Sequence, residues 1–416
     1  MHVIGIDIGK GMHAMAALDE CGRLVMEPEM FPQTASGFEA LSARLESLGG
    51  PKGIRVGMEA TGRYWIPLRH SLAGLGYRVE VVNPLLTAHE IATDVRGRKS
   101  DRTDAAAIAA ALQRDRHSPA PAEDPVGDPL RGLTRHRTFL VRQRSDAKRR
   151  IHASLDVLFP EAQAAFGNLF AAGTMALLKR FPSARLLAQA NTRTIASLLS
   201  AASRRRCPPE KARELRDAAR RSVCATLRNE GEEAALVSTL ELIGFLGGQI
   251  GEAEKRIKTM DAPPAAVVLE SVRGVGPLLS RTIAAEYGDL SRFADPSKKQ
   301  PVSGMSRRML AFAGCEPRVP GSGNWKGRAR ISKRGSPSLR TALWQAASMC
   351  RLHNPIFQAM YERQCARNKH HTVAIFHLVR KLLEIWCGMY KSNTLFNPQA
   401  TAQPHVHNSS KNTLQR

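Results

Sequence analysis

A charged residue stands inside the first apolar segment of the chain, Val3-Ile4-Gly5-Ile6-Asp7-Ile8-Gly9. An ionised carboxylate between two isoleucines is costly to bury unless something compensates its charge, so Asp7 needs a partner. Glu59 ends a second apolar run, and Asp101 and Asp104 stand three residues apart at a predicted helix start, on one helix face. Because hard divalent cations take several carboxylate oxygens, these four residues together predict a metal site.

Three of the four carboxylates also have a simpler interpretation. Acids in the first turn of a helix interact favourably with the helix dipole, which would account for Asp101 and Asp104. Glu59 would then be an ordinary surface residue at a strand end. Asp7 fits such an interpretation least well, so we expect Asp7, Glu59, Asp101 and Asp104 to act as an ordered set of catalytic ligands for a divalent metal ion.

The order of the predicted elements places this set on a sheet. Helical spacing predicts helices over residues 38–48 and 64–75 and from residue 101 onward. Runs of apolar residues predict strands at 3–8, 13–17, 23–26, 53–58 and 77–82. A hairpin followed by alternating helices and strands is typical of a layered α/β structure. Residues 1–128 are therefore expected to form an α/β domain of the RNase H type.

The charge of the chain is strongly uneven. Residues 1–120 carry 14 basic and 14 acidic side chains, so the net charge of +24 lies entirely after residue 120. A neutral half joined to a cationic half indicates that the cationic half binds a polyanion. The expected nucleic-acid contacts lie on a basic helix and in a basic loop near residues 314–337. They are Arg131, Arg135, Arg142, Lys148, Arg149, Lys326, Arg328, Arg330, Lys333 and Arg334.

Residues 129–393 are predicted to be mainly helical. Residues 129–262 are predicted to form a basic, coiled-coil-like helical region, which is a candidate dimerisation element. Its seam, that of a coiled coil or of a helical hairpin, is Ile243, Leu246, Ile250, Ala253 and Ile257, which alternate by three and four residues. Residues 263–393 are predicted to form a mainly α-helical domain, and 394–416 a disordered polar tail. Seven scattered cysteines and the lack of an 18-residue apolar run predict a cytoplasmic, nucleoid-associated protein without a membrane span.

Two glycine-containing segments within residues 263–393 are further candidates for nucleic-acid binding or catalysis. Ser271–Leu279 resembles a helix–hairpin–helix turn, in which Gly274 and Gly276 would let backbone N–H groups approach a DNA phosphate. Gly321-Ser322-Gly323 presents a serine between two glycines, with Ser303 as a competing nucleophile. Composition alone favours a flexible loop that only grips phosphate over a catalytic serine.

Taken in order, the motifs resemble the insertion-sequence 110 family of transposases, the DEDD serine recombinases that include the Piv-type invertases. The N-terminal matches are Ile4–Lys10, Met58–Tyr64 and Lys99–Ala105. The C-terminal matches are Gly274–Pro277, Ala313–Pro317, Gly321–Gly323, Ile331–Gly335 and Leu339-Arg340. The resemblance covers most of residues 1–155 and 265–390, while the segment 160–260 is only weakly similar.

The resemblance implies a RuvC-like N-terminal domain in which Asp7, Glu59, Asp101 and Asp104 hold Mg²⁺. It implies that Ser322 is the nucleophile that joins covalently to DNA, which reverses the interpretation from composition. It also implies a homodimer or homotetramer that pairs the carboxylates of one protomer with the serine of another. A non-coding guide RNA, bridging donor and target DNA, is the other implied partner.

Other classes of protein remain open at this point. A metal-dependent nuclease of junction-resolvase type would use the carboxylates to activate water and leave Ser322 inert. A non-catalytic nucleic-acid-binding protein would retain binding without Asp7 or Glu59. Actin-like ATPases and sugar kinases also begin with a similar strand, but no second phosphate loop follows and the charge of +24 has no role there. The sequence does not separate a transposase from an invertase.

Overall fold

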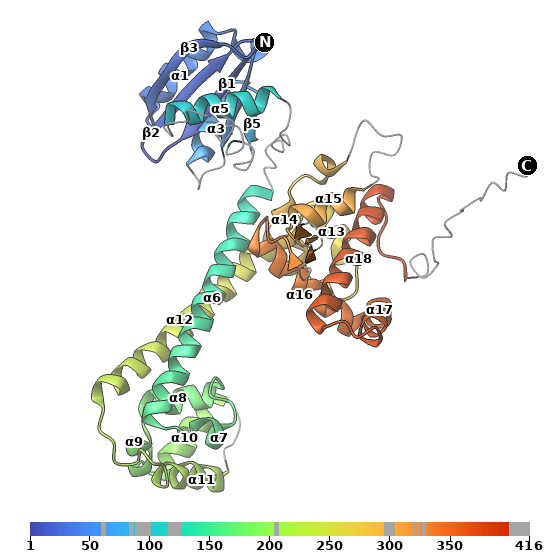
Figure 1. Ribbon diagram of the computed structural model, residues 1–416. Helices are drawn as coiled ribbons and strands as arrows, with labels where there is room; N and C mark the ends of the chain where they lie inside the picture. Colours follow the sequence, from blue (N-terminus) through green and yellow to red (C-terminus); the bar gives the residue numbers. More distant parts are fainter. Residues whose placement is uncertain are drawn as a thin grey trace, which may run out of the picture. The chain divides into compact units, whose positions relative to one another are not determined.

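The structure is a computed structural model. It describes residues 1–59, 64–82, 87, 101–114, 127–203, 208–294, 304–318, 321–322, 325–326 and 330–398 (Figure 1). The chain divides into two compact units, Met1–Glu123 and Asp124–Arg416. The first boundary lies close to the predicted one at 128. Division of the second unit at 262 stays a prediction, as does disorder of residues 399–416, which lie outside the described ones. At the start of the predicted tail, Phe396 is half-buried against the C-terminal core and its N–H donates to the hydroxyl of Ser271 at 2.9 Å.

The first unit is built on a five-stranded sheet of order β3-β2-β1-β4-β5. Its strands are β1 (His2–Ile8), β2 (Met12–Leu18), β3 (Leu24–Pro32), β4 (Ile54–Glu59) and β5 (Val79–Val82). β1 pairs antiparallel with β2, and β2 with β3, whereas β1, β4 and β5 run parallel. This is the arrangement of an RNase H-like sheet, so the predicted α/β class of the N-terminal domain is confirmed.

Helices cover both faces of this sheet (Figure 1). They are α1 (Ala35–Ser47), α2 (Gly50–Gly53), α3 (Trp65–Gly74) and α5 (Asp101–Gln113). Ile4, Ile6 and Ile8 of β1 join a core with Leu41 and Leu72 of α1 and α3. The alternate face of the sheet packs on α5, where Val3 meets Ile108 and Leu112. Successive strand residues point to opposite faces, so Asp7 belongs to the face that α5 covers.

His13 of β2 is a buried residue that the sequence did not mark out. Its ring lies 5.0 Å from that of Phe31 and 6.3 Å from that of Phe38. Neither ring nitrogen has a hydrogen-bond partner among the described residues. Burial lowers the pKa of His13, because the apolar surroundings disfavour the imidazolium. His13 pairs with Ile8 and lies on the face opposite Asp7, so it belongs to the core.

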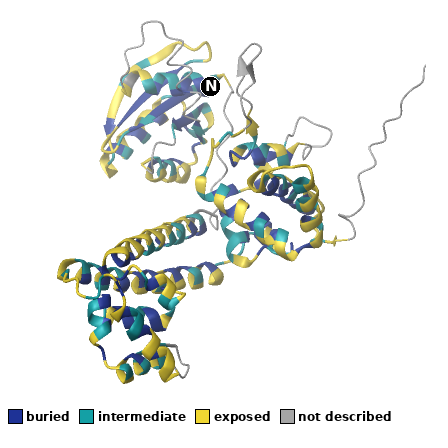
Figure 2. Ribbon diagram, turned by 60° about the horizontal axis from the view of Figure 1, so that its bottom comes forward, coloured by how far each residue is buried: buried dark blue, intermediate teal, exposed yellow. Residues whose placement is uncertain are grey.

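Two long helices of the second unit, α6 (Gly127–Leu158) and α12 (Glu230–Thr259), lie side by side (Figure 1). Arg137 pairs with Glu254 and Arg150 with Glu232, a register that makes the two helices antiparallel. All five predicted seam residues of α12 are buried, and the buried stripe runs along the pair in Figure 2. The pair carries a small group of helices at one end. They are α7 (Ala162–Phe166), α8 (Ala172–Arg180), α9 (Ala184–Gln189), α10 (Thr192–Ser203) and α11 (Pro209–Arg220).

The C-terminal part is a helical bundle. Its elements are α13 (Pro264–Glu270), α14 (Pro277–Tyr287), the short 3-10 helix η1 (Leu290–Phe293), α15 (Met305–Phe312), α16 (Pro337–His353), α17 (Pro355–Ala366) and α18 (His371–Ser392). Tyr287, Phe357 and Trp386 are fully buried in its core. The indole N–H of Trp386 donates to the carbonyl oxygen of Ala265 at 2.9 Å. The predicted mainly helical character of residues 263–393 is confirmed.

Short strands replace part of the predicted basic loop. β6 (Pro317–Arg318) pairs antiparallel with β9 (Arg330–Ile331), and β7 (Gly321–Ser322) pairs with β8 (Trp325–Lys326). Helix α15 was also not predicted. Two-residue strands show no periodicity, and an eight-residue helix with two central arginines shows little, so neither feature is visible in the sequence.

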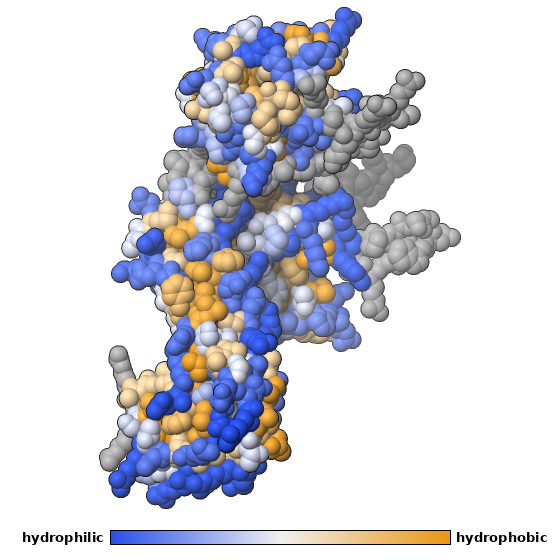
Figure 3. Space-filling model, turned by 90° about the vertical axis from the view of Figure 1, so that its left-hand side faces the viewer, coloured by the Kyte–Doolittle hydropathy of each residue, from blue (hydrophilic) through white to orange (hydrophobic). Residues whose placement is uncertain are grey.

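One helix among the described residues, α12, is long and apolar enough to cross a membrane by length and composition. Its ion pairs with α6 and its buried seam show that it packs as part of a protein helix pair. Outside this seam α12 exposes two large apolar side chains, Leu242 at 47% and Phe245 at 64%. Figure 3 shows apolar side chains gathered along this helical pair.

Candidate functional site

Two of the four carboxylates stand at the same edge of the sheet. Asp7 is the penultimate residue of β1 and Glu59 is the last residue of β4. These strands are parallel neighbours in which Ile6 pairs with Met58. Asp7 and Glu59 therefore follow a paired position on adjacent strands and lie at the carboxyl ends of both.

The other two carboxylates reach this edge because α5 packs unusually close to β1. A Cβ atom added to Gly5 would lie 2.1 Å from the carbonyl oxygen of Ala105 and 2.4 Å from the amide nitrogen of Ala109. Glycine on the strand and alanines on the helix thus let the two backbones meet. Asp104, which precedes Ala105, is partly buried, and Asp101 is exposed one turn earlier.

The electrostatics of Asp7 show that the carboxylates gather. Its pKa is raised from 3.8 to about 6, first by burial and then by the negative charges of Asp104, Asp101 and Glu59. The backbone N–H of Ile8 opposes this shift by donating to the carboxylate. The other three carboxylates predicted from the sequence are therefore each within electrostatic reach of Asp7.

The donor set suits a hard cation. Carboxylate oxygens are the ligands that Mg²⁺ prefers, and a cation at this edge would relieve the repulsion that raises the pKa of Asp7. In the part of the chain that the structure describes, no three Asp, Glu, His or Cys side chains are close enough together to hold a metal ion. Binding one would need the carboxylates to draw together, and their role as ligands stays a prediction.

Ser322 lies in a short hairpin of the second unit. In the ladder of β7 and β8, Gly321 pairs with Lys326 and Ser322 pairs with Trp325. Arg328, Gly323 and the competing Ser303 lie outside the described residues. The roles of Ser322 as nucleophile and of Lys326 and Arg328 as phosphate contacts stay predictions.

The segment that follows β9 is tightly held. Lys333 adopts a left-handed conformation (φ 55°), and its N–H donates to the carbonyl oxygen of Gly314 at 3.0 Å. One terminal nitrogen of Arg340 donates to three carbonyl oxygens, those of Ala313, Lys333 and Gly335, at 3.2, 3.2 and 2.9 Å. This anchoring role of Arg340 was not expected from the sequence. Arg330, Lys333 and Arg334, the predicted DNA contacts of this segment, are all exposed.

The predicted helix–hairpin–helix turn joins α13 and α14, and its two glycines differ. An added Cβ on Gly274 (φ 105°) would lie 2.8 Å from the backbone of Cys350 in α16. Close packing of the turn on α16 therefore explains why glycine is present there. Gly276 is the N-cap of α14, and nothing lies within 4 Å of a Cβ placed on it. DNA binding by both glycines stays a prediction.

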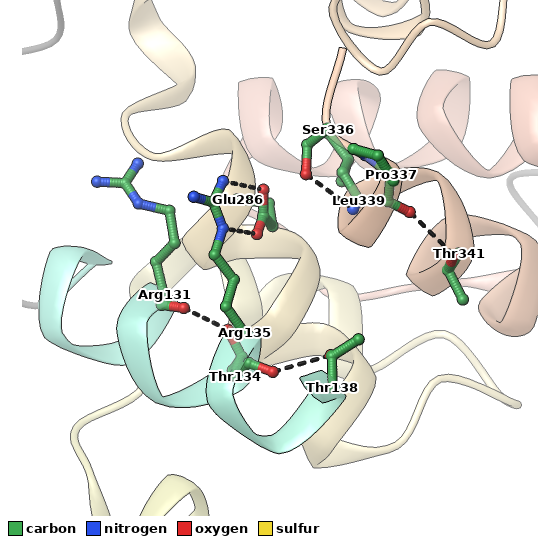
Figure 4. A network of polar contacts seen from close by, with 9 residues as sticks. All are labelled: Arg131, Thr134, Arg135, Thr138, Glu286, Ser336, Pro337, Leu339 and Thr341. Carbon is green, nitrogen blue, oxygen red and sulfur yellow. Dashed lines mark hydrogen bonds and ion pairs between the residues drawn. The ribbon is translucent and has the colours of Figure 1, made fainter. Parts of the chain in front are cut away.

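The predicted DNA contacts on α6 fall into two groups. Arg135 is part of an internal ion pair, because its guanidinium donates to both carboxylate oxygens of Glu286 in α14, at 2.6 and 2.9 Å (Figure 4). The side chain of Glu286 is only 1% exposed, and this contact raises the pKa of Arg135. Arg131 extends from the preceding turn beside Arg135 in Figure 4.

The remaining cations of α6 lie further along the helix. Arg149 pairs with Asp146, and the ammonium of Lys148 lies 4.5 Å from the centre of the Phe170 ring. Arg142 is exposed and forms no ion pair with any residue that the structure describes. Among the predicted contacts on α6, Arg142 is thus the one whose charge is most available to a nucleic acid.

Comparisons with known proteins fit this combination of an RNase H-like carboxylate domain and a basic helical body. Residues 4–160 match a family model described as "Transposase", of the DEDD type, and residues 266–362 match "Transposase IS116/IS110/IS902 family". The IS116 insertion-element 44.8 kDa protein of Streptomyces clavuligerus is 25% identical over 406 residues, covering 95% of this chain and 96% of the relative. The mini-circle putative transposase for IS117 of Streptomyces coelicolor is 25% identical over 393 residues and covers 91% of each chain.

The fold and the matches define a transposase. The chain belongs to the IS110 family of transposases, as the sequence motifs indicated. Among solved structures, Thermus thermophilus RuvC in complex with a Holliday junction is 18% identical and covers 28% of this chain and 95% of RuvC, with a TM-score of 0.22. The RNase H-like fold of the first unit is identified by the order of its strands, β3-β2-β1-β4-β5.

Proposed function

We propose that this transposase cuts and rejoins DNA through a serine nucleophile, Ser322, assisted by Mg²⁺ at Asp7, Glu59, Asp101 and Asp104. The observation that carries the proposal is the raised pKa of Asp7, about 6, which results first from burial and then from the negative charges of Asp104, Asp101 and Glu59. A sheet edge with this much negative charge is suited to a cation. The family membership supplies the class of reaction, transposition of DNA.

The chemistry proposed for Ser322 is phosphoryl transfer. The hydroxyl of Ser322 gives up its proton to solvent as its Oγ attacks the phosphorus of a DNA phosphodiester. A phosphoserine bond forms, and the bond to the leaving DNA oxygen breaks as that oxygen takes up a proton from solvent. Attack by a second DNA hydroxyl on the phosphoserine reverses the steps and releases Ser322. Mg²⁺ would supply charge neutralisation at the phosphate and a lower pKa for the attacking hydroxyl. Exposed cations of the second unit would hold the DNA backbone.

We further propose that the protein acts as a homodimer or homotetramer. An apolar face of α12 supports self-association, because Leu242, Phe245 and Gly248 step by three residues along one side of the helix and both large side chains are exposed. Nothing lies within 4 Å of a Cβ placed on Gly248, so another helix has room to approach the backbone. In the assembly, Ser322 of one protomer would act with the carboxylates of another.

A non-coding guide RNA and a cytoplasmic, nucleoid-associated location complete the proposal. The net charge of +24, all carried after residue 120, is large enough for contacts to more than one nucleic-acid strand. An RNA transcribed beside the gene would then be required for the choice of DNA site.

Trapping of a covalent intermediate tests the proposed chemistry. The full-length protein is incubated with Mg²⁺, labelled element-junction DNA and the flanking RNA, and then separated on a denaturing gel. A protein–DNA band that disappears in Ser322→Ala and in Asp7→Ala, but persists in Ser303→Ala, is the expected result. Omission of the RNA from the same reaction tests the guide.

The outcomes separate the competing classes. Free cleavage products that survive Ser322→Ala without a covalent band would mean a water-using metal nuclease of junction-resolvase type. Binding without cleavage at any Mg²⁺ concentration would mean a non-catalytic nucleic-acid-binding protein. A band lost in Ser303→Ala instead would move the nucleophile to Ser303.

A further inference from the structure

Two arginines face each other across the short ladder at the base of the Ser322 hairpin. In the antiparallel pairing of β6 with β9, Arg318 is directly opposite Arg330. Both are exposed. Residues directly opposite in an antiparallel ladder have Cβ atoms about 5 Å apart, and like charges at such positions destabilise the pairing. The ladder therefore keeps two cations together at a cost to its own stability.

The surrounding backbone prevents this pair from separating. The N–H of Ser332 donates to the carbonyl oxygen of Glu316 at 3.0 Å, which extends the pairing by one step. Glycines hold the next residues by close approach, since a Cβ on Gly314 would lie 2.7 Å from the backbone of Arg334. Arg340 then joins three carbonyl oxygens of the same region. The separation of the two arginine Cα atoms is thus fixed by contacts outside the ladder.

No acidic residue that the structure describes compensates the two charges. Glu316 is the nearest acidic residue in the chain, and no other occurs before Glu362. Among the described residues, neither Arg318 nor Arg330 forms an ion pair, with Glu316 or with any other acid. Lys333 and Arg334 follow close by and add positive charge.

We propose that Arg318 and Arg330 form a clamp for a single phosphate of the DNA strand that Ser322 attacks. Two guanidinium groups held side by side match the oxygens of one phosphate, and the anion removes the repulsion between them. Arg318 is four residues from Ser322, so their Cα atoms lie at most about 14 Å apart. The phosphate held in the clamp is therefore close to the reacting one.

This inference deepens the proposed function and rests on Ser322 being near the reacting phosphate. The test of the clamp is a binding measurement that needs no DNA cleavage. The clamp can therefore be disproved without disproving the proposed chemistry of Ser322, and the reverse is also true. DNA affinity is measured over a range of salt concentrations for the full-length Ser322→Ala protein and for the same protein carrying Arg318→Ala, Arg330→Ala or both. The probe is labelled element-junction duplex.

The clamp predicts a specific pattern of non-additive losses. Each single substitution should lower affinity about tenfold, as loss of a charged hydrogen bond does, and should reduce the salt slope by about 0.9, the value for one phosphate. The double variant should lose no more slope than either single variant, because both arginines hold the same phosphate. A double variant that loses about twice the slope would show two separate phosphate contacts and overturn the clamp. Unchanged slopes in all three variants would also overturn it.

A charge reversal separates binding from folding. Arg318→Glu should raise the thermal unfolding midpoint, because the introduced carboxylate would face Arg330 as an opposite charge. The same variant should lower DNA affinity at least as much as Arg318→Ala. The matched control is Arg193→Glu on α10, which makes the same change in net charge at another exposed arginine. If Arg318→Glu and Arg193→Glu lower DNA affinity equally, the loss is explained by net charge alone and the clamp is disproved.

Discussion

Gly5 of β1 and Ala105 of α5 lie so close that a Cβ atom on Gly5 would stand 2.1 Å from the carbonyl oxygen of Ala105. That approach sets the distance between the strand that carries Asp7 and the helix that carries Asp104. The acidic edge of the sheet therefore depends on the absence of a side chain two residues before its central aspartate.

Substitution of Gly5 by alanine should damage both stability and activity. Because backbone atoms of α5 occupy the space, the helix must move away from β1, and overpacking of this kind costs about 1–3 kcal/mol. The same shift would carry Asp104 away from Asp7. Chemical unfolding and strand-transfer assays check the two effects. Gly11→Ala is the matched control, since nothing lies within 4 Å of a Cβ on Gly11. Equal behaviour of the two variants would contradict the proposed role of Gly5.

Asp7→Asn should abolish DNA cleavage but stabilise the metal-free protein. The folded-state pKa of Asp7 is about 6 against an ordinary 3.8, so its stabilising contribution is full below 3.8 and is lost as pH rises through 6. Asparagine cannot ionise. The difference in Tm between variant and wild type, measured in EDTA, should therefore grow from pH 4 to pH 7, in favour of the variant. Mg²⁺ should raise the wild-type Tm and reduce that difference. A difference independent of pH would mean that neither burial nor the neighbouring carboxylates raise the pKa of Asp7 in the folded protein.

Arg135→Met should destabilise the second unit strongly. It would leave the Glu286 carboxylate, 1% exposed, without its cation; because the Arg135 side chain is itself 44% exposed, water partly screens the remaining charge, and we expect a cost of about 1–3 kcal/mol. Adding Glu286→Leu should restore much of the loss, because no charge then remains buried. Denaturant unfolding monitored by circular dichroism gives the free energies of unfolding.

Arg142→Met is the matched control for that experiment. Arg142 is an exposed arginine of the same helix, so its loss should change stability by less than about 0.5 kcal/mol. It should lower the salt slope of DNA binding by about 0.9. The reverse pattern, with Arg142 required for folding and Arg135 for binding, would overturn this division between the two arginines.

Phe245→Glu should turn the assembled protein into a monomer. The ring is 64% exposed on the apolar face of α12, and a carboxylate there would have to be desolvated in any helix–helix interface. Sedimentation equilibrium gives the mass. Val223→Glu is the control, because Val223 is 81% exposed and lies outside the two long helices. If Phe245→Glu keeps the wild-type mass, this face does not mediate assembly.

The N-terminal half could be predicted from sequence because its signals are local. Alternation, helix starts and turn residues gave the order of strands and helices, and the ordered carboxylates gave the acidic edge. What sequence did not reveal is the cause of that edge, since the contact of Gly5 with Ala105 joins residues 100 positions apart. The role of His13 as a buried, unpartnered core residue was equally hidden.

The second half was harder for the same reason. Arg135 resembles its basic neighbours in sequence, yet its partner Glu286 lies 151 residues away. The facing of Arg318 and Arg330 depends on two-residue strands that leave no periodic pattern. When the role of a residue depends on a partner far away in the sequence, local composition predicts that the residue is charged but does not predict which residue it contacts.

The antiparallel pair of α6 and α12 also has a consequence for engineering. It is an arm whose length is set by two matched helices with a repeating seam, and it carries the small group α7–α11 at one end. Removal of seven residues from each helix would shorten the arm by about 10 Å while leaving the seam in register. The length of the α6–α12 pair can therefore be changed in steps of seven residues without redesign of the helices at either end.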